Sequence, residues 1–137
     1  MPQGSVLGPT LFNIYINDLL WFIKGEEVCN YADDTTIYKC NNGLNILLNN
    51  LEIDSSNAIN WFKNNYMKLN TGKCKLIVAG QKDHKTHIKV GDSTINEVDS
   101  VKLLGIKIDN KLTFKEHLDK KFKKANSKLA AIKINKI

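Results

Sequence analysis

The sequence predicts an α+β domain, in which helices pack on short antiparallel hairpins. Three segments carry apolar residues at helical spacing, and between them short β-prone runs are separated by turn residues at hairpin distances. The long β–α–β alternation of a doubly wound parallel sheet is absent. With 137 residues, of which 42% are hydrophobic, the chain is one domain or a piece of a larger one, and it can bury a packed core.

The first predicted helix covers residues 9–23. The loop PQGSVLG precedes it, and Pro9 stands at the first helical position, where its lack of an N–H costs nothing. The apolar residues that follow recur at helical spacing: Leu11, Phe12, Tyr15, Leu19 and Phe22. The segment is too short and too polar to span a bilayer, and no signal peptide is visible. We therefore expect a buried helix and no membrane partner.

A hairpin is predicted around the stretch YADDTTIY, residues 31–38. Residues 28–31 and 35–38 are β-prone, and Ala32, Asp33 and Asp34 separate them. Both aspartates are therefore expected at the hairpin tip. Two interpretations fit two adjacent like charges there: a surface turn that carries them harmlessly, or a metal site that requires them.

The second predicted helix covers residues 44–66, with an interruption at residues 54–57. Its apolar residues again follow helical spacing: Leu44, Leu47, Leu48, Leu51, Ile59 and Phe62. Two strands are predicted after it, a brief one at residues 67–70 and a longer one at residues 73–80 that ends at a glycine.

The remaining β segments form a second hairpin and one long strand. Residues 87–90 and 94–98 flank Gly91 and Asp92, which is typical of a small hairpin. Residues 101–109 are predicted to be a single strand. Gly105 lies inside this strand, where a glycine indicates a bulge or a close backbone contact.

The last predicted helix begins at a capping box formed by Thr113 and Glu116. Its apolar residues follow a 4-3-4-3 spacing along one face, which we expect to pack inward: Leu118, Phe122, Ala125, Leu129 and Ile132. Most of its lysines lie elsewhere on the helix.

The positive charge is concentrated at the C-terminal end. The chain carries 20 Lys+Arg and 14 Asp+Glu, a net charge of +6, and every one of these cations is a lysine. Residues 1–110 hold 11 lysines and 12 acidic residues, a net charge of −1, whereas residues 111–137 hold 9 lysines and 2 acidic residues, a net charge of +7. This asymmetry indicates a polyanionic partner near the C-terminal end; the alternative is a merely solvated helix face.

The cysteines and histidines favour no zinc or disulfide framework. Cys29, Cys40 and Cys74 are odd in number and contain no C-x-x-C pair, which fits a reduced intracellular compartment. His84 and His87 lie in a polar stretch without a second cysteine pair, so we interpret them as solvated loop residues.

Four stretches in this order resemble the reverse transcriptase domain of non-LTR (LINE-like) retrotransposons: PQGSVLGPTLFNIYINDLL, YADDTTIY, WFKNNYMKLNTGKCKLIV and VKLLGIKIDNKLTFKEHL. The resemblance covers nearly the whole chain. It implies a partial polymerase palm with motifs B to E over residues 1–110, in which helices pack on a short antiparallel sheet with a catalytic hairpin. It also implies that residues 111–137 begin a thumb-like helical segment.

The resemblance assigns roles to two loops. Gln3, Gly4 and Ser5 match polymerase motif B, which in the family borders the template base and the incoming nucleotide. The residues that match motif C are Tyr31, Ala32, Asp33 and Asp34. Tyr31 and Ala32 then also lie at the substrate, Asp33 is the expected metal ligand, and Asp34 has a less direct role beside it.

The implied cofactor is a pair of Mg²⁺ ions, which we expect only in the complete domain. They would activate the primer 3′-hydroxyl and stabilise the leaving pyrophosphate. Mg²⁺ takes hard oxygen ligands, often one or two carboxylates together with substrate phosphates. The adjacent charges of Asp33 and Asp34 are then tolerated because cations neutralise them.

Further positions match motif D and the signature that follows it. Lys73 is the candidate to meet the triphosphate or to protonate the leaving pyrophosphate; Lys68 is its rival, and a surface strand lysine is the alternative for either. Leu104-Gly105 and Ile108-Asp109 match the LG-x-x-ID signature of the family, and Asp109 is interpreted as structural.

The thumb-like segment supplies the expected contacts with the nucleic-acid backbone through Lys120, Lys121, Lys123, Lys124 and Lys128. The implied partners are an RNA template, a DNA primer, deoxynucleoside triphosphates and the N-terminal half of the polymerase, in the cytoplasm and nucleus. In the family, a fingers region and a further metal-binding aspartate precede motif B. We therefore expect this chain to be a fragment that is inactive by itself. The alternatives are a non-catalytic nucleic-acid-binding remnant and an unrelated α+β interaction domain.

Overall fold

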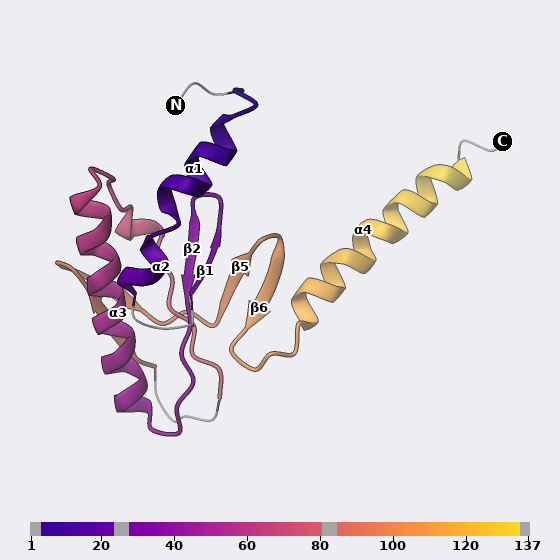
Figure 1. Ribbon diagram of the computed structural model, residues 1–137. Helices are drawn as coiled ribbons and strands as arrows, with labels where there is room; N and C mark the ends of the chain where they lie inside the picture. Colours follow the sequence, from indigo (N-terminus) through magenta and orange to yellow (C-terminus); the bar gives the residue numbers. More distant parts are fainter. Residues whose placement is uncertain (1–3, 24–27, 81–84, 135–137) are drawn as a thin grey trace. The chain divides into compact units, whose positions relative to one another are not determined.

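The computed structural model describes residues 4–23, 28–80 and 85–134 (Figure 1). These residues form two compact units. The first comprises residues 1–74 together with 88–95, and the second comprises residues 75–87 together with 96–137. The predicted α+β class is confirmed, because helices accompany three small antiparallel hairpins in the described part of the chain. The division into residues 1–110 and 111–137 stays a prediction.

The N-terminal segment of the first unit forms two helices, α1 (Gly8–Ile16) and α2 (Leu19–Phe22). The prediction of one helix over residues 9–23 was therefore wrong. Asn17 and Asp18 form a turn between the two helices. Both are weak helix formers, because their short polar side chains compete for the backbone groups that a helix needs. Hydrogen bonding restarts at this point, where Trp21 N–H donates to the Asp18 carbonyl over 3.0 Å.

The long helix α3 (Leu44–Asn64) continues without a break, so the predicted interruption at residues 54–57 was wrong. Asp54 and Ser55 are buried within it. The Asp54 carboxylate lies 2.8 Å from the Lys39 ammonium group. Burying a carboxylate is costly unless it is paired, so this ion pair lets a polar stretch remain helical at the interior.

An apolar core joins these elements. Its buried members come from the N-terminal helices and from α3: Ile16, Leu19, Ile23, Ala58, Trp61 and Phe62. Trp61 is 1% exposed, and its ring makes edge contacts with Tyr15 and Phe62 at centroid distances of 6.2 and 5.3 Å. Figure 1 shows α2 beside α3, with the β1–β2 hairpin next to them.

The segment after α3 is a loop and a short 3₁₀ helix, η1 (Thr71–Lys73). The strands predicted at residues 67–70 and 73–80 were therefore wrong. Met67 and Leu69 pack against the core of the first unit, so their apolar side chains are partly buried without a partner strand. Leu76 makes an isolated parallel bridge with Glu97 inside the second unit.

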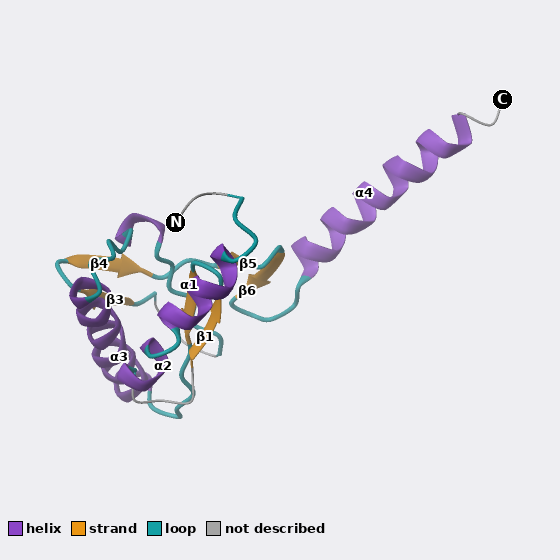
Figure 2. Cartoon of the chain, turned by 45° about the horizontal axis from the view of Figure 1, so that its top comes forward, coloured by secondary structure: helices purple, strands orange, loops and turns teal. Residues whose placement is uncertain are grey.

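The second predicted hairpin is confirmed as β3 (His87–Val90) and β4 (Ser93–Asn96). Gly91, in the turn, has a φ of 60°, which glycine adopts readily. Ile88, Val90 and Ile95 are buried. The Lys89 N–H donates to Glu52 Oε1 of α3 over 2.7 Å, and Figure 2 shows this hairpin beside α3.

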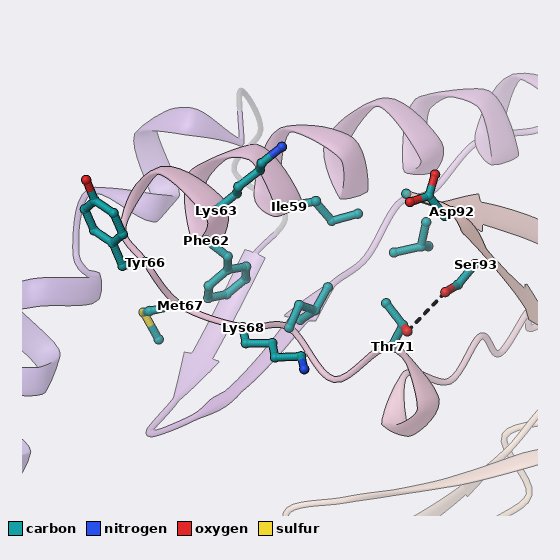
Figure 3. Close-up of a pocket in the computed structure, with 12 residues that line it drawn as sticks. Ile59, Phe62, Lys63, Tyr66, Met67, Lys68, Thr71, Asp92 and Ser93 are labelled. Atoms are coloured by element: carbon teal, nitrogen blue, oxygen red, sulfur yellow. Dashed lines mark hydrogen bonds between the residues drawn. The ribbon is translucent and has the colours of Figure 1, made fainter.

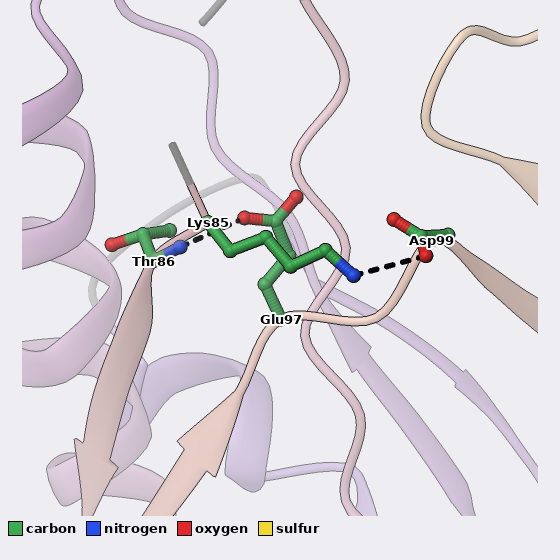
Figure 4. Close-up of polar contacts among 4 residues, drawn as sticks. All are labelled: Lys85, Thr86, Glu97 and Asp99. Atoms are coloured by element: carbon green, nitrogen blue, oxygen red, sulfur yellow. Dashed lines mark hydrogen bonds and ion pairs between the residues drawn. The ribbon is translucent and has the colours of Figure 1, made fainter. Parts of the chain in front are cut away.

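Residues 85–87 of the second unit are held to residues 96–99 by polar contacts (Figure 4). The Thr86 N–H donates to Glu97 Oε2 over 3.1 Å, and the Glu97 N–H donates to the Thr86 carbonyl over 3.0 Å. Lys85 and Asp99 form an exposed ion pair at 2.9 Å. Because Glu97 is buried, the bond from Thr86 compensates part of the cost of burying its carboxylate.

The segment predicted to be one strand at residues 101–109 is instead a hairpin, β5 (Ser100–Leu103) and β6 (Ile106–Asp109). Leu104 and Gly105 form its two-residue turn, with φ values of 47° and 86°. Two successive positive φ angles are typical of a type I′ turn, which matches the twist of the flanking strands. Gly105 is therefore a turn residue. The prediction of a bulge or a close backbone contact was wrong, because a Cβ built on Gly105 would meet no atom within 4 Å.

Asp109 organises the start of the last helix, α4 (Lys115–Ile134). Its carboxylate accepts hydrogen bonds from the backbone N–H groups of Lys111, Thr113 and Phe114 and from the Thr113 hydroxyl, at 2.7–3.1 Å. The predicted capping box was wrong in both halves, because the Thr113 hydroxyl accepts from the Lys115 N–H over 3.4 Å and the Thr113 N–H bonds to Asp109. Glu116 pairs with Lys107 instead. The interpretation of Asp109 as structural agrees with these bonds.

The apolar face of α4 does not pack inward in the described part of the chain, so that expectation was wrong. Leu118, Phe122, Leu129 and Ile132 are 49%, 65%, 57% and 58% exposed. The base of the helix is nevertheless attached to β6, since the Lys107 N–H donates to His117 Nδ1 over 3.2 Å.

We predict that Asp109→Asn loosens the loop at residues 110–114 and the first turn of α4. An amide presents one acceptor oxygen where the carboxylate has two. Hydrogen bonds to the charged form, from the Thr113 N–H above all, lower the pKa of Asp109 below its ordinary value. Its stabilising contribution is therefore present above the pKa of the unfolded chain and is lost as the pH falls through the lower folded pKa. Hydrogen exchange of residues 110–118 measures both effects.

The control for this test is Asp119→Asn, an exposed carboxylate on α4 that makes no hydrogen bond with described residues. Exchange in residues 110–118 that is equally slow in the Asp109→Asn variant and in the control would contradict the assigned role.

Candidate active site

The hairpin of β1 (Val28–Tyr31) and β2 (Asp34–Ile37) carries the two adjacent aspartates. Tyr31 pairs directly with Asp34, which leaves Ala32 and Asp33 as a two-residue turn. Asp33 alone therefore lies at the tip, and Asp34 is the first residue of β2. The expectation that both aspartates occupy the tip was wrong, because the register takes Asp34 into the ladder.

The turn contains a strained position. The φ angle is 52° at Ala32 and is not positive at Asp33, the pattern of signs found in a type II′ hairpin turn. Glycine is favoured at the first position of such a turn, because a Cβ there crowds the backbone. Ala32, which directly precedes the tip aspartate, therefore adopts a conformation that costs about 1–3 kcal/mol.

The two faces of the hairpin differ in burial. Val28 and Ile37 pack against the apolar core on one face. Tyr31 and Asp34 lie on the opposite face and are exposed, and Asp33 is exposed at the tip. Because successive residues of a strand point to opposite faces, anchoring one face leaves both carboxylates open to solvent.

The donor chemistry fits part of a magnesium site. Two carboxylates adjacent in sequence offer hard oxygen ligands, and Mg²⁺ commonly takes one or two carboxylates and fills the other positions with water or phosphate. Within the described residues, no group of three or more His, Cys, Asp or Glu side chains is placed to hold a metal. The side chains of Asp33 and Asp34 make no hydrogen bond or ion pair with other described residues, so their carboxylate oxygens are available.

The residues of the N-terminal loop are only partly described. Gln3 lies outside the described residues. Gly4 has a φ of 87°, and a Cβ built on it would meet no atom within 4 Å. Ser5 is exposed, and its carbonyl accepts a hydrogen bond from the Gly8 N–H over 3.3 Å. The conformation at Gly4 therefore requires glycine, whereas the roles of these residues at a template or nucleotide stay predictions.

The two candidate lysines lie on the segment that follows α3. Lys73 is the last residue of η1, and Lys68 lies in the preceding loop. Both are exposed, and no hydrogen bond or ion pair among the described residues links either of them to Asp33 or Asp34. The structure does not bring Lys73 into contact with the hairpin aspartates, and its predicted role stays untested.

The five lysines of α4 that were predicted to contact nucleic acid are open to solvent. Lys120, Lys121, Lys123, Lys124 and Lys128 are exposed. Within the second unit they form a positively charged surface over several helical turns, and residues 111–137 carry a net charge of +7. Such a surface can bind phosphates without reading the sequence of bases.

Sequence reasoning missed two polar residues behind the turn. Asn30 and Thr35 form a cross-strand pair on the core-facing side of the hairpin. The Asn30 Oδ1 and Thr35 Oγ1 atoms are buried without a hydrogen-bond partner among the described residues. The strand register places this pair on the core-facing side. A register shifted by one residue would place the same side chains on the open face, so the pair could be found only once the turn residues were known.

Comparison with known proteins shows the family. Residues 1–108 match the family model described as "Reverse transcriptase (RNA-dependent DNA polymerase)". The chain belongs to this reverse transcriptase family. The match covers most of the chain and includes the hairpin that carries Asp33 and Asp34, so the resemblance to reverse transcriptases of non-LTR retrotransposons is confirmed.

Two curated reverse transcriptases are similar over most of this chain. The RNA-directed DNA polymerase from mobile element jockey of Drosophila melanogaster is 29% identical over 126 residues, and that of Drosophila funebris is 27% identical over 130 residues. Each alignment covers 86% of this chain and 14% of the relative. The chain thus spans about a seventh of the length of these reverse transcriptases. No solved structure matches it significantly.

Among the described residues, none of the helices combines the length and the apolar character needed to cross a membrane.

We predict that Ala32→Val destabilises this reverse transcriptase hairpin by about 1–3 kcal/mol, because a β-branched side chain tolerates positive φ poorly. Ala32→Gly is the matched control and should leave the free energy of unfolding unchanged or raise it, since glycine adopts this conformation without strain. Urea denaturation followed by tryptophan fluorescence measures both changes. Equal stability of the valine variant and the parent would show that the turn is not held at positive φ.

Proposed function

We propose that this chain supplies motif C and adjoining palm segments of an RNA-directed DNA polymerase, which adds deoxynucleotides to a primer 3′-hydroxyl on an RNA template. The observation that carries this proposal is the exposed Asp33 carboxylate at the tip of a core-anchored hairpin. It stands in a chain that belongs to the reverse transcriptase family.

In this proposal Asp33 and Asp34 hold Mg²⁺, with Asp33 as the main ligand. When bound, such ions lower the pKa of the attacking hydroxyl and offset the charge that develops on phosphate oxygens. The protein holds Asp33 at the tip and Asp34 on the open face of β2, so both can approach a substrate phosphate. We place a third carboxylate in another part of the polymerase, because the described residues bring together no third one.

The remaining assignments are part of the same proposal. Gln3, Gly4 and Ser5 border the template base and the incoming nucleotide, together with Tyr31 and Ala32. Lys73 meets the triphosphate or protonates the leaving pyrophosphate. The 64% exposure of Tyr31 on the open face of the hairpin supports contact with a substrate there.

We further propose that α4 lies against the template–primer duplex. Its exposed lysines supply point charges that can meet phosphates without distinguishing bases. The same feature supports the second candidate function, a non-catalytic nucleic-acid-binding remnant. Polymerase activity separates the two, because the remnant would bind a duplex without extending a primer.

We predict that residues 1–137 alone do not extend a primer, whereas the chain fused to the preceding polymerase segment of the jockey relative does. In the fusion, Asp33→Ala should abolish detectable extension, because it removes the main metal ligand, and Asp34→Asn should leave a measurable fraction. The measurement is primer extension on an RNA template with Mg²⁺ and deoxynucleotides.

The matched control is Asp99→Ala, which removes a carboxylate from an exposed ion pair of small energetic value. Its extension should equal that of the parent fusion. Full activity of the Asp33→Ala fusion would show that the hairpin is not the metal site, and robust extension by residues 1–137 alone would contradict the need for another carboxylate.

We predict that α4 gives salt-dependent binding to an RNA–DNA hybrid. If about four lysines meet phosphates, the slope of log K against log salt should be on the order of −3 to −4. Replacing Lys120, Lys121, Lys123 and Lys124 with Gln should flatten the slope and weaken binding to all sequences alike. Fluorescence anisotropy across a salt series measures this.

The control removes the same charge elsewhere, with Lys75, Lys89, Lys102 and Lys111 replaced by Gln; all four are exposed. It should change the slope less than the α4 variant does. Equal slopes for the α4 variant and the parent would leave α4 as a merely solvated face.

A further inference from the structure

The first unit contains an open cavity of about 500 Å³ between the C-terminal end of α3 and the β3–β4 turn (Figure 3). Its floor is apolar and includes Phe62 and Leu69. Lys63 projects from α3 and Lys68 from the opposite loop. The Ser93 hydroxyl donates to the Thr71 hydroxyl over 3.1 Å at the far end. The cavity therefore combines an apolar floor with a cationic rim and neutral polar groups.

Tyr66 stands beside this cavity in an unusual conformation. It follows the C-cap residue Asn65 of α3 and has a φ of 54°. The Tyr66 N–H donates to the Lys63 carbonyl over 3.2 Å, and the Met67 N–H donates to the Phe62 carbonyl over 2.8 Å. These two bonds define a Schellman motif, in which the position of Tyr66 is usually a glycine.

The fold does not explain a tyrosine at this position. Its side chain is 100% exposed, so its ring buries no apolar surface in the described chain. Glycine would adopt the same backbone without strain. A strained residue that gains no packing is a reason to look for a ligand. An exposed aromatic ring is a surface on which a nucleobase can stack.

The charges beside Tyr66 indicate the ligand. Lys63 precedes it by three residues and Lys68 follows it by two, and both are exposed. The two lysines flank Tyr66 in the sequence, and in Figure 3 their side chains extend away from its ring. Because exposed lysine side chains are long and flexible, they can turn toward the phosphates on either side of a base that stacks on Tyr66. Asp92 lies at the other end of the cavity and repels phosphate, so we expect the strand to lie at the Tyr66 end.

We propose that Lys63, Tyr66 and Lys68 form a contact for single-stranded nucleic acid, in which one base stacks on the Tyr66 ring and its flanking phosphates meet the two lysines. The contact requires neither the aspartates of the β1–β2 hairpin nor the lysines of α4. It can therefore stand or fail independently of the proposed polymerase function.

The test uses the full chain with Lys120, Lys121, Lys123 and Lys124 replaced by Gln, which lowers binding through α4. Affinity for a labelled twelve-nucleotide oligouridine is measured by fluorescence anisotropy. Tyr66→Gly should weaken binding by about five- to tenfold, because one stacking contact is lost. The same variant should raise the melting temperature, because glycine removes the backbone strain. Binding and stability then move in opposite directions.

Three further variants keep the test decisive. Tyr66→Phe should retain most of the affinity, since the ring remains, and Lys63→Gln with Lys68→Gln should weaken binding and flatten its salt dependence. Tyr38→Ala removes another exposed tyrosine and should change neither property. Should Tyr66→Gly fail to fold, the phenylalanine and lysine variants still decide.

Photocrosslinking locates the contact directly. With an oligouridine that carries 5-iodouridine, the crosslinked peptide should contain Tyr66. The proposal is overturned by crosslinks confined to other segments, by parental affinity in folded Tyr66→Gly, or by an acidic peptide that binds at Tyr66 while the oligonucleotide does not.

Discussion

The burial of Trp61 is the interaction on which the first unit depends. Its indole is 1% exposed and lies against Tyr15 and Phe62, in a cluster that also contains Leu19 and Ile23. Burying an aromatic side chain of this size supplies much of the hydrophobic stabilisation available to a small unit. The same cluster receives Val28 and Ile37, so the core that orders the helices also anchors the hairpin.

This anchoring matters because a two-stranded hairpin is marginally stable by itself. With Val28 and Ile37 held in the core, strand geometry places Tyr31 and Asp34 on the open face. The turn then carries Asp33 at the tip. A site for phosphoryl chemistry needs carboxylates that are fixed but accessible, and an apolar anchor on one face supplies both conditions.

The sequence predicted the hairpin that carries Asp33 and Asp34 better than it predicted several other elements. The YADD hairpin was predictable because β-prone runs flank a short polar turn. The β5–β6 hairpin was not, because Leu104 is a poor residue for positive φ and the run of apolar residues around it is typical of one strand. The predicted interruption at residues 54–57 was wrong because tertiary pairing overrides the low helix propensity there. The ion pair with Lys39 lets Asp54 remain in the helix.

The other differences depend on features that sequence patterns do not show. Asp109 captures the N–H of Thr113 that a capping box would have used, which a local pattern does not reveal. The binding role that we propose for Tyr66 could not be predicted from the sequence, because it is argued from a backbone angle at a helix end. The exposed apolar face of α4 is a surface that tends to drive association, and the relatives extend far beyond the aligned segment. We expect such a face to be covered in longer proteins of this kind.

The central claim is that Asp33 and Asp34 form one metal-binding tip on an anchored hairpin. The most direct measurement is a titration of the polymerase fusion, ¹⁵N-labelled in residues 1–137, with Mn²⁺, a paramagnetic substitute for Mg²⁺, followed by amide line broadening. The account predicts that the amides of residues 31–35 broaden first and that Asp33→Ala abolishes this broadening. Broadening spread evenly over the acidic residues, or centred on a different segment, would contradict the account.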